Sequence, residues 1–289
     1  MPQYRRNMQA RALKNLTQLP PAKRLDVIAE GLELLVEHVT TLTDDLMYLS
    51  KGGRPRGALV LEAQSQEEAA KVLILLDLVR LGWGDPIKVN VQIKRFYDHL
   101  SRCIYAEVAK MRPADFAEIC RMVEDMRQAY YLDGPNDVDW IFRSQLLSSR
   151  EEGLYVDYVQ YEDVGAWTTP ARYDDVLEMH VDTAVQQLVI ALHRLGVTSR
   201  RGLEVLADTW VGQVISKATR WSVVRDLNAQ MLARLDEDRG ATPGAMDAYS
   251  RRVISQWTFP LHSLDLTPTD VKIKDLQQLR ERRLAAQYP

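Results

Sequence analysis

Three ionisable residues, Glu67, Glu68 and Lys71, lie within the strongly apolar stretch Gln66–Leu81. This stretch is too apolar to form a surface helix, so we expect some of its polar side chains to be buried. Ionised groups that enter a buried helix need a partner, or their pKa shifts until they become neutral. The sequence therefore predicts a polar cluster inside a helical core, and this cluster is the candidate site.

A second group of polar residues further along the chain offers partners for this cluster. Asp98 and His99 are the natural candidates to meet the acidic pair, and they lie among Lys94, Arg95 and Arg102. Histidine is the usual acid or base near neutral pH, and guanidinium groups hold phosphate through paired hydrogen bonds. This combination indicates acid–base chemistry at a phosphate. The alternative interpretation is a solvated basic face in which the imidazole packs against a neighbouring aromatic ring.

A third group follows Arg150, where a predicted helix ends and the chain turns at Gly153. The next residues, 154–159, alternate between apolar and polar, which is typical of a strand or an extended arm. Tyr155 and Asp157 fall on the same side and offer a hydroxyl and a carboxylate to a shared binding site. Alternatively, the arm covers an open groove of the bundle.

The first group has other interpretations, namely a surface ion pair or a metal site. Glu67 and Lys71 are four residues apart on one helical face, so they can also form an ordinary surface ion pair, worth about 0.3–0.5 kcal/mol. A carboxylate dimetal site needs a Glu-x-x-His motif, but the residue three after Glu68 is a lysine, whose ammonium repels metal. The chain also has neither of the usual glycine-rich nucleotide motifs. We therefore expect no metal and no cofactor.

Hydrophobic periodicity predicts an all-α, multi-helix bundle with one short extended arm near 154–159. We favour a start near Arg56 for the second helix over a start capped at Ser65. A boundary near Pro170 divides an N-terminal bundle, 1–170, from a C-terminal helical region, 171–289, packed on it. The expected helices span about 22–49, 56–81, 88–111, 113–131, 137–152, 174–195, 201–216, 221–235, 245–257 and 269–286.

Composition narrows the class of protein. The chain has 289 residues and a net charge of −3, which disfavours a generally cationic nucleic-acid binder but leaves room for a local basic groove. No apolar run reaches the roughly 18–20 residues of a membrane span, and the N-terminus lacks the apolar region of a secretory signal. Two cysteines without zinc spacing fit a reducing cytoplasm. We expect a cytoplasmic protein without membrane attachment.

Three motifs in order resemble those of the AbiV-type abortive infection proteins, bacterial members of the broad HEPN class of helical domains. The motifs are EEAAK at 67–71, DH at 98–99 with basic neighbours, and REEGLYVDY at 150–158, followed by Trp167 and Pro170. The resemblance covers roughly residues 25–195. It implies an all-helical, HEPN-like, homodimeric cytoplasmic protein that limits phage propagation.

The resemblance also implies a reaction to test. Many HEPN domains are metal-independent ribonucleases with an Arg-x(4–6)-His motif at a dimer interface. No histidine of this chain has an arginine at that spacing; Lys94 comes five residues before His99, and Arg95 comes four before. Lysine holds a phosphate as a point charge but lacks the two-pronged geometry of arginine.

Two functional hypotheses follow. In the first, the chain is a defence protein that binds a phage or host protein. Its polar clusters then either stabilise the bundle or line a groove of this chain in which the partner binds. In the second it cleaves RNA: His99 is the general acid or base, Arg95 and Arg102 hold the phosphate, and Glu67 or Glu68 orients the imidazole. The remaining residues assigned to binding are Lys71, Lys94, Asp98, Arg150, Tyr155 and Asp157. A scaffold without a defence role is a third interpretation.

Overall fold

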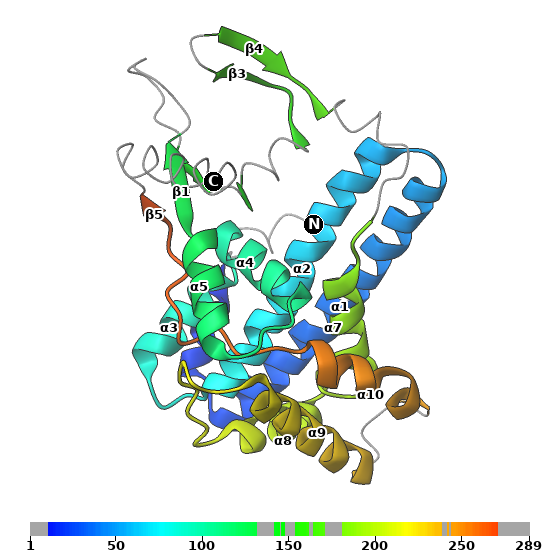
Figure 1. Ribbon diagram of the computed structural model, residues 1–289. Coiled ribbons are helices and arrows are strands. Elements are labelled where there is room, and N and C mark those ends of the chain that lie inside the picture. Colours follow the sequence, from blue (N-terminus) through cyan, green and yellow to red (C-terminus); the bar gives the residue numbers. More distant parts are fainter. Residues whose placement is uncertain are drawn as a thin grey trace, which may run out of the picture.

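The computed structural model shows an all-α, multi-helix bundle with two small sheets at one end (Figure 1). This confirms the fold class predicted from the sequence. The structure describes residues 11–131, 142–144, 146–147, 154–161, 164–170, 181–238, 242 and 244–270.

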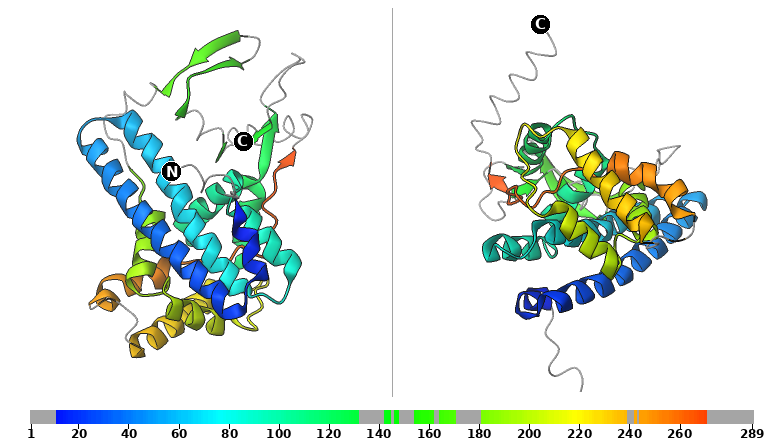
Figure 2. Two further views of the ribbon diagram at one scale, coloured as in Figure 1. Left: turned by 180° about the vertical axis from the view of Figure 1, so that it is seen from behind. Right: turned by 90° about the horizontal axis from the view of Figure 1, so that it is seen from below.

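Helices α1 (Pro21–Lys51) and α2 (Pro55–Leu81) form a long hairpin that runs through the molecule (Figures 1 and 2). α2 begins at Pro55, which agrees with the longer of the two predicted starts. It is buried on every side from 72 to 80, as expected for a helix that is apolar all round. It packs against α1 and against four further helices described below. α1 instead buries one stripe at three- and four-residue spacing: Ile28, Leu32, Val36, Val39, Leu42 and Leu46.

The helix predicted over 88–111 is two helices, α3 (Pro86–Arg95) and α4 (His99–Lys110). The chain turns between them, and the Asp98 carboxylate accepts the backbone N–H of Ser101 at 2.7 Å as the N-cap of α4. An aspartate in extended conformation with this bond starts a helix, so the continuous prediction was wrong here. A short 3₁₀ helix, η2 (Ala12–Gln18), packs against α3.

Four C-terminal helices lie against the α1–α2 hairpin or on one another. α7 and α8 pack directly on α1 and α2, whereas α9 packs on α8 and α10, and α10 packs on α7 (Figure 1). The irregular segment 257–268, here called the C-terminal strap, follows α10, and its lack of regular structure over 259–268 agrees with the prediction. The bounds are α7 (Ala184–Arg194), α8 (Arg200–Trp210), α9 (Trp221–Glu237) and α10 (Ala245–Gln256).

The strands correct several helix predictions. The helix predicted over 113–131 is α5 (Phe116–Met126) followed by β1 (Gln128–Tyr131), which pairs antiparallel with β2 (Phe142–Ser144) and parallel with β5 (Thr269–Asp270). β2 and β5 therefore stand where the sequence predicts helices, and the rest of 269–286 lies outside the described residues. Most of the helix predicted over 137–152 and the first part of the helix predicted over 174–195 also lie outside the described residues. β1 satisfies its backbone groups by pairing with β2 on one side and, about 140 residues further along the chain, with β5 on the other.

The predicted extended arm is one strand of a hairpin. β3 (Asp157–Tyr161) pairs antiparallel with β4 (Val164–Thr168), and Tyr158 stands opposite Trp167. Figure 1 shows this hairpin at the end of the molecule away from α8, α9 and α10.

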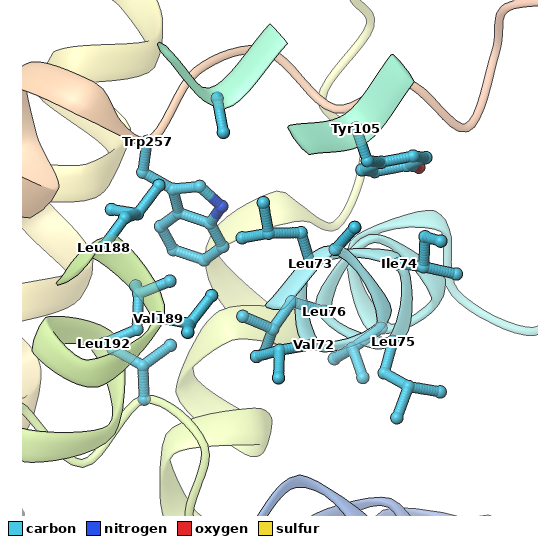
Figure 3. Close-up of a cluster of buried hydrophobic side chains, with 14 of the residues drawn as sticks. Val72, Leu73, Ile74, Leu75, Leu76, Tyr105, Leu188, Val189, Leu192 and Trp257 are labelled. Atoms are coloured by element: carbon cyan, nitrogen blue, oxygen red, sulfur yellow. The ribbon is translucent and has the colours of Figure 1, made fainter. Parts of the chain in front are cut away.

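One hydrophobic core runs through the bundle and includes buried residues from 16 to 266. Its centre is the apolar run of α2, which packs against Leu188, Val189 and Leu192 of α7 and against the Trp257 indole (Figure 3). The described part of 171–289 thus shares its core with the N-terminal helices.

Gly202, in the first turn of α8, allows a close backbone approach to the segment 196–197. A Cβ on Gly202 would lie 2.0 Å from the carbonyl oxygen of Gly196 and 2.6 Å from that of Val197. We expect Gly202→Ala to lower the free energy of unfolding by about 2–3 kcal/mol, because the backbone must shift. Urea unfolding followed by circular dichroism measures this change.

The matched control is Gly31→Ala in α1, where an added Cβ meets nothing within 4 Å. This change should raise stability by about 0.5–1 kcal/mol through helix propensity. Similar losses in both variants would contradict the close approach at α8.

Candidate functional site

The Glu67 carboxylate of α2 contacts two basic side chains of α4. Its Oε2 atom lies 2.9 Å from His99 Nδ1 and 3.0 Å from a terminal nitrogen of Arg102. Only 8% of the Glu67 side chain is exposed. A buried carboxylate needs hydrogen-bond donors, and these two side chains supply them. The two predicted polar groups are thus joined through Glu67, and we call Glu67, Glu68, Lys71, His99 and Arg102 the Glu67 cluster.

The start of α4 positions the two basic side chains. His99 is the first residue of the helix, directly after the Asp98 cap, and Arg102 follows three residues later on the same face. Asp98 was predicted to meet the acidic pair, but its carboxylate caps α4 instead. Its role is to fix the turn from which His99 projects.

The His99 imidazole is held on one side and open on the other. Nδ1 faces the Glu67 carboxylate, and in the neutral ring Nδ1–H then donates this bond and leaves the lone pair on Nε2. The side chain is 53% exposed, and Nε2 makes no hydrogen bond within the described part of the chain. An oriented imidazole with an accessible nitrogen can accept or donate a proton at a bound substrate.

The Arg102 guanidinium bonds to groups of the protein and is largely shielded from solvent. Its guanidinium donates to the backbone carbonyls of Asp98 and Tyr97, at 3.3 and 3.2 Å, in addition to its ion pair with Glu67. Its side chain is only 10% exposed. Arg102 therefore balances the carboxylate charge and rigidifies the turn before α4.

Lys71 pairs with a different glutamate from the one that the four-residue spacing predicts. Its ammonium bonds to Glu68, three residues earlier, and lies 5.5 Å from the centre of the Phe96 ring. This pairing points Lys71 towards the α3–α4 turn and leaves Glu67 to the side chains of α4. Both partners are mostly buried, with 17% and 15% of their side chains exposed.

Arg95, predicted to hold a phosphate, lies elsewhere. It is buried, and its guanidinium donates to Gln92 Oε1 at 2.9 Å and to the backbone carbonyls of Leu261 and Leu264 in the C-terminal strap. Its donors are therefore used inside the protein. As the last residue of α3, it ties the strap to the helix that ends just before the His99 turn.

A second polar cluster, built on Asp77, was not predicted. The Asp77 carboxylate accepts bonds from the Tyr105 hydroxyl at 2.8 Å, the backbone N–H of Leu261 at 2.7 Å and the Arg80 guanidinium at 3.2 Å. Burial lowers the pKa of Arg80 to about 10 although Asp77 opposes this shift, and burial also raises the pKa of Tyr105 well above its usual value. These residues line a cavity of about 20 Å³ under the strap. In the sequence, the only sign was a three-residue Asp–Arg spacing within an apolar run.

The remaining predicted binding residues do not join the Glu67 cluster. Lys94 is exposed on α3, and Tyr155, 58% exposed ahead of β3, makes no hydrogen bond or ring contact with the cluster within the described residues. Asp157 begins β3, but its side chain and Arg150 lie outside what the structure describes.

Comparison of the chain with protein-family models, with curated proteins and with solved structures finds no match. The site geometry therefore carries the functional argument. Within the described ranges, no three or more histidine, cysteine, aspartate or glutamate side chains are grouped so that they could hold a metal ion. Of the helices described, none has the length and apolarity required to cross a membrane.

Replacement of Glu67 and replacement of Glu68 should lower the free energy of unfolding by different amounts. Glu67→Ala leaves the buried Arg102 guanidinium without its counter-charge, so we expect a loss of about 3–5 kcal/mol in the free energy of unfolding. Glu68→Ala leaves Lys71 17% exposed and still in contact with the Phe96 ring, so we expect a smaller loss of about 1–2 kcal/mol. Chemical unfolding of both variants measures the difference. Equal losses would show that Glu67 is not the buried centre of the cluster.

Proposed function

We propose that this protein cleaves RNA without a metal ion, with His99 as the catalytic acid or base. One observation carries this proposal: a half-exposed imidazole is oriented by a buried carboxylate that an arginine neutralises. Such an imidazole has its accessible nitrogen fixed in direction, and the adjacent carboxylate stabilises the imidazolium formed during reaction.

The reaction requires only groups that RNA and His99 supply. Nε2 of His99 removes the proton of a ribose 2′-hydroxyl, whose oxygen then attacks the adjacent phosphorus. The bond from phosphorus to the 5′-oxygen breaks, and that oxygen takes a proton from the imidazolium or from water. The products are a 2′,3′-cyclic phosphate and a 5′-hydroxyl end, so DNA is not a substrate. Glu67 acts through the imidazole and is a positioning residue.

The biological setting that we propose is phage defence in the bacterial cytoplasm, with phage or host RNA as the target. Support for this setting is the order of the three motifs at 67–71, 98–99 and 150–158. The homodimer implied by the same resemblance stays a prediction.

Replacement of His99 tests the reaction. His99→Ala should lower the rate of cleavage of single-stranded RNA about 10²–10⁴-fold in buffer with EDTA, the range that a general acid or base contributes. His38→Ala is the control because His38 is exposed on α1, outside the Glu67 cluster. Cleavage is measured on labelled RNA, with a 2′-deoxy substitution at the scissile nucleotide as a second control. If wild-type protein and His99→Ala both leave RNA intact, the proposal is wrong.

A second function, binding of a phage or host protein, is favoured by the β3–β4 hairpin. Tyr158 and Trp167 are 58% and 71% exposed and contact each other edge to face, and Tyr155 and Val156 before β3 are 58% and 63% exposed. A two-stranded hairpin with little buried apolar surface is marginally stable alone. Exposed aromatic residues are also the usual anchors of protein interfaces.

If the hairpin binds the partner, changes in the hairpin should reduce partner binding without changing RNA cleavage. Replacement of both Tyr155 and Trp167 by alanine should weaken partner binding by about 10³-fold, since each interface anchor contributes about 2 kcal/mol and the two together about 4 kcal/mol. Protection of bacteria against phage should fall with it, whereas RNA cleavage should not change. Val214→Ala, at a position 85% exposed after α8, is the control. Undiminished protection in the double variant would rule out the hairpin as the binding surface.

A further inference from the structure

Exposed cations lie on two segments that meet at the turn carrying His99, namely the N-terminal segment that contacts Tyr97 and helix α3. Arg11 and Lys14, at the start of the described chain, and Lys94, on α3, are exposed and form no ion pair within the described residues. Some other surface arginines, such as Arg127, Arg200 and Arg201, are each held by carboxylates. We call Arg11, Lys14 and Lys94 the basic patch. Its charges are available to an external anion.

Tyr97 connects the patch to the site. The Arg11 guanidinium lies 5.8 Å from the centre of the Tyr97 ring, and the backbone N–H of Leu13 donates to the Tyr97 hydroxyl at 3.2 Å. The backbone carbonyl of the same tyrosine accepts the guanidinium of Arg102. One residue thus holds the N-terminal segment on one side and the Glu67 cluster on the other, two positions before His99.

The backbone at Arg11 supports a specific placement of this side chain. Arg11 has φ of 57°, in the left-handed region that residues with a side chain seldom adopt. Such a conformation persists only where surrounding contacts favour it, and here it accompanies the contact with the tyrosine ring. The conformation therefore presents a guanidinium next to the α3–α4 turn.

We infer that the basic patch binds the phosphates of single-stranded RNA on the nucleotides that flank the cleaved bond; this inference rests on the proposed function. Exposed lysine and arginine side chains bind phosphates by displacing counterions, and they position the strand without reading its sequence. A single strand fits the chemistry because the attacking 2′-oxygen must align with the leaving 5′-oxygen. A regular A-form duplex holds these atoms out of line.

The chain as a whole is acidic, with a net charge of −3, so RNA binding must be local. Around the turn, Lys71 and Arg102 accompany the three cations of the patch, against the carboxylates of Glu67, Glu68 and Asp98. Each of those carboxylates is already bound to a protein donor. Around this turn, the cations of the patch are therefore the exposed charges that no carboxylate of the described residues holds.

The test uses the full chain carrying His99→Ala, so that binding is measured without cleavage. Fluorescence anisotropy of a labelled 12-nucleotide single-stranded RNA of mixed sequence is recorded over a range of salt concentrations. In this background, R11Q and K94Q together should weaken binding about tenfold. They should also lower the slope of log affinity against log salt by about 1.4, since each phosphate contact contributes about 0.7 in single strands.

The matched control is R225Q with R251Q, which removes two exposed arginines from α9 and α10. Both doubles change the net charge equally, and circular dichroism verifies that both fold. A control double that weakens binding as much as R11Q/K94Q would overturn the inference, as would an unchanged slope. Equal affinity for a duplex of the same length would overturn the preference for single strands. RNA binding by the patch without any cleavage by wild-type protein would refute the proposed function alone.

Discussion

The structure depends on one constraint: α2 is buried on every side over 72–80 and also carries ionisable side chains along its length. The buried carboxylates of Glu67 and Asp77 receive hydrogen bonds from neighbouring elements, because a buried polar group needs a partner. Asp77 shows the consequence most clearly, because its three donors come from α2 itself, from α4 and from the C-terminal strap. An apolar core tolerates several packing arrangements, whereas a buried carboxylate accepts only the one that brings its donors together. The polar residues of α2 thereby fix the positions of elements that are distant in sequence.

The same constraint extends to the candidate site. Arg95 binds the strap carbonyls from the last turn of α3, and the chain then turns through Phe96–Asp98 into α4. Asp98 caps that helix, and Arg102 returns two bonds to the turn. The direction of the His99 ring is thus set by interactions that begin in the C-terminal strap. Loss of an interior contact at Arg95 would loosen the site although Arg95 does not touch it.

Sequence reasoning located the long helices and the two polar groups because both depend on local pattern. The apolar stripe of α1 and the continuous apolar run of α2 specify their own bounds. The break before α4 was missed because Asp98 was interpreted as a site residue, although an aspartate ahead of a helical stretch is also an N-cap. The Asp77 cluster was missed for a different reason: its donor at Leu261 lies 184 residues away. Pairing over such a distance is decided by tertiary packing and leaves no local pattern.

The two polar clusters of α2 differ in the solvent exposure of the groups that contact each carboxylate. Ten residues, about 15 Å along the helix, separate Glu67 from Asp77, and α4 supplies partners to both. The donors to Asp77 are all buried, so its carboxylate anchors the strap and α4 to α2 and does not face solvent. Glu67 instead shares its charge with an imidazole that is half exposed. Of the two clusters, the Glu67 cluster is the one that joins an interior carboxylate to an imidazole that solvent can reach, and this difference is the reason for proposing the reaction at His99.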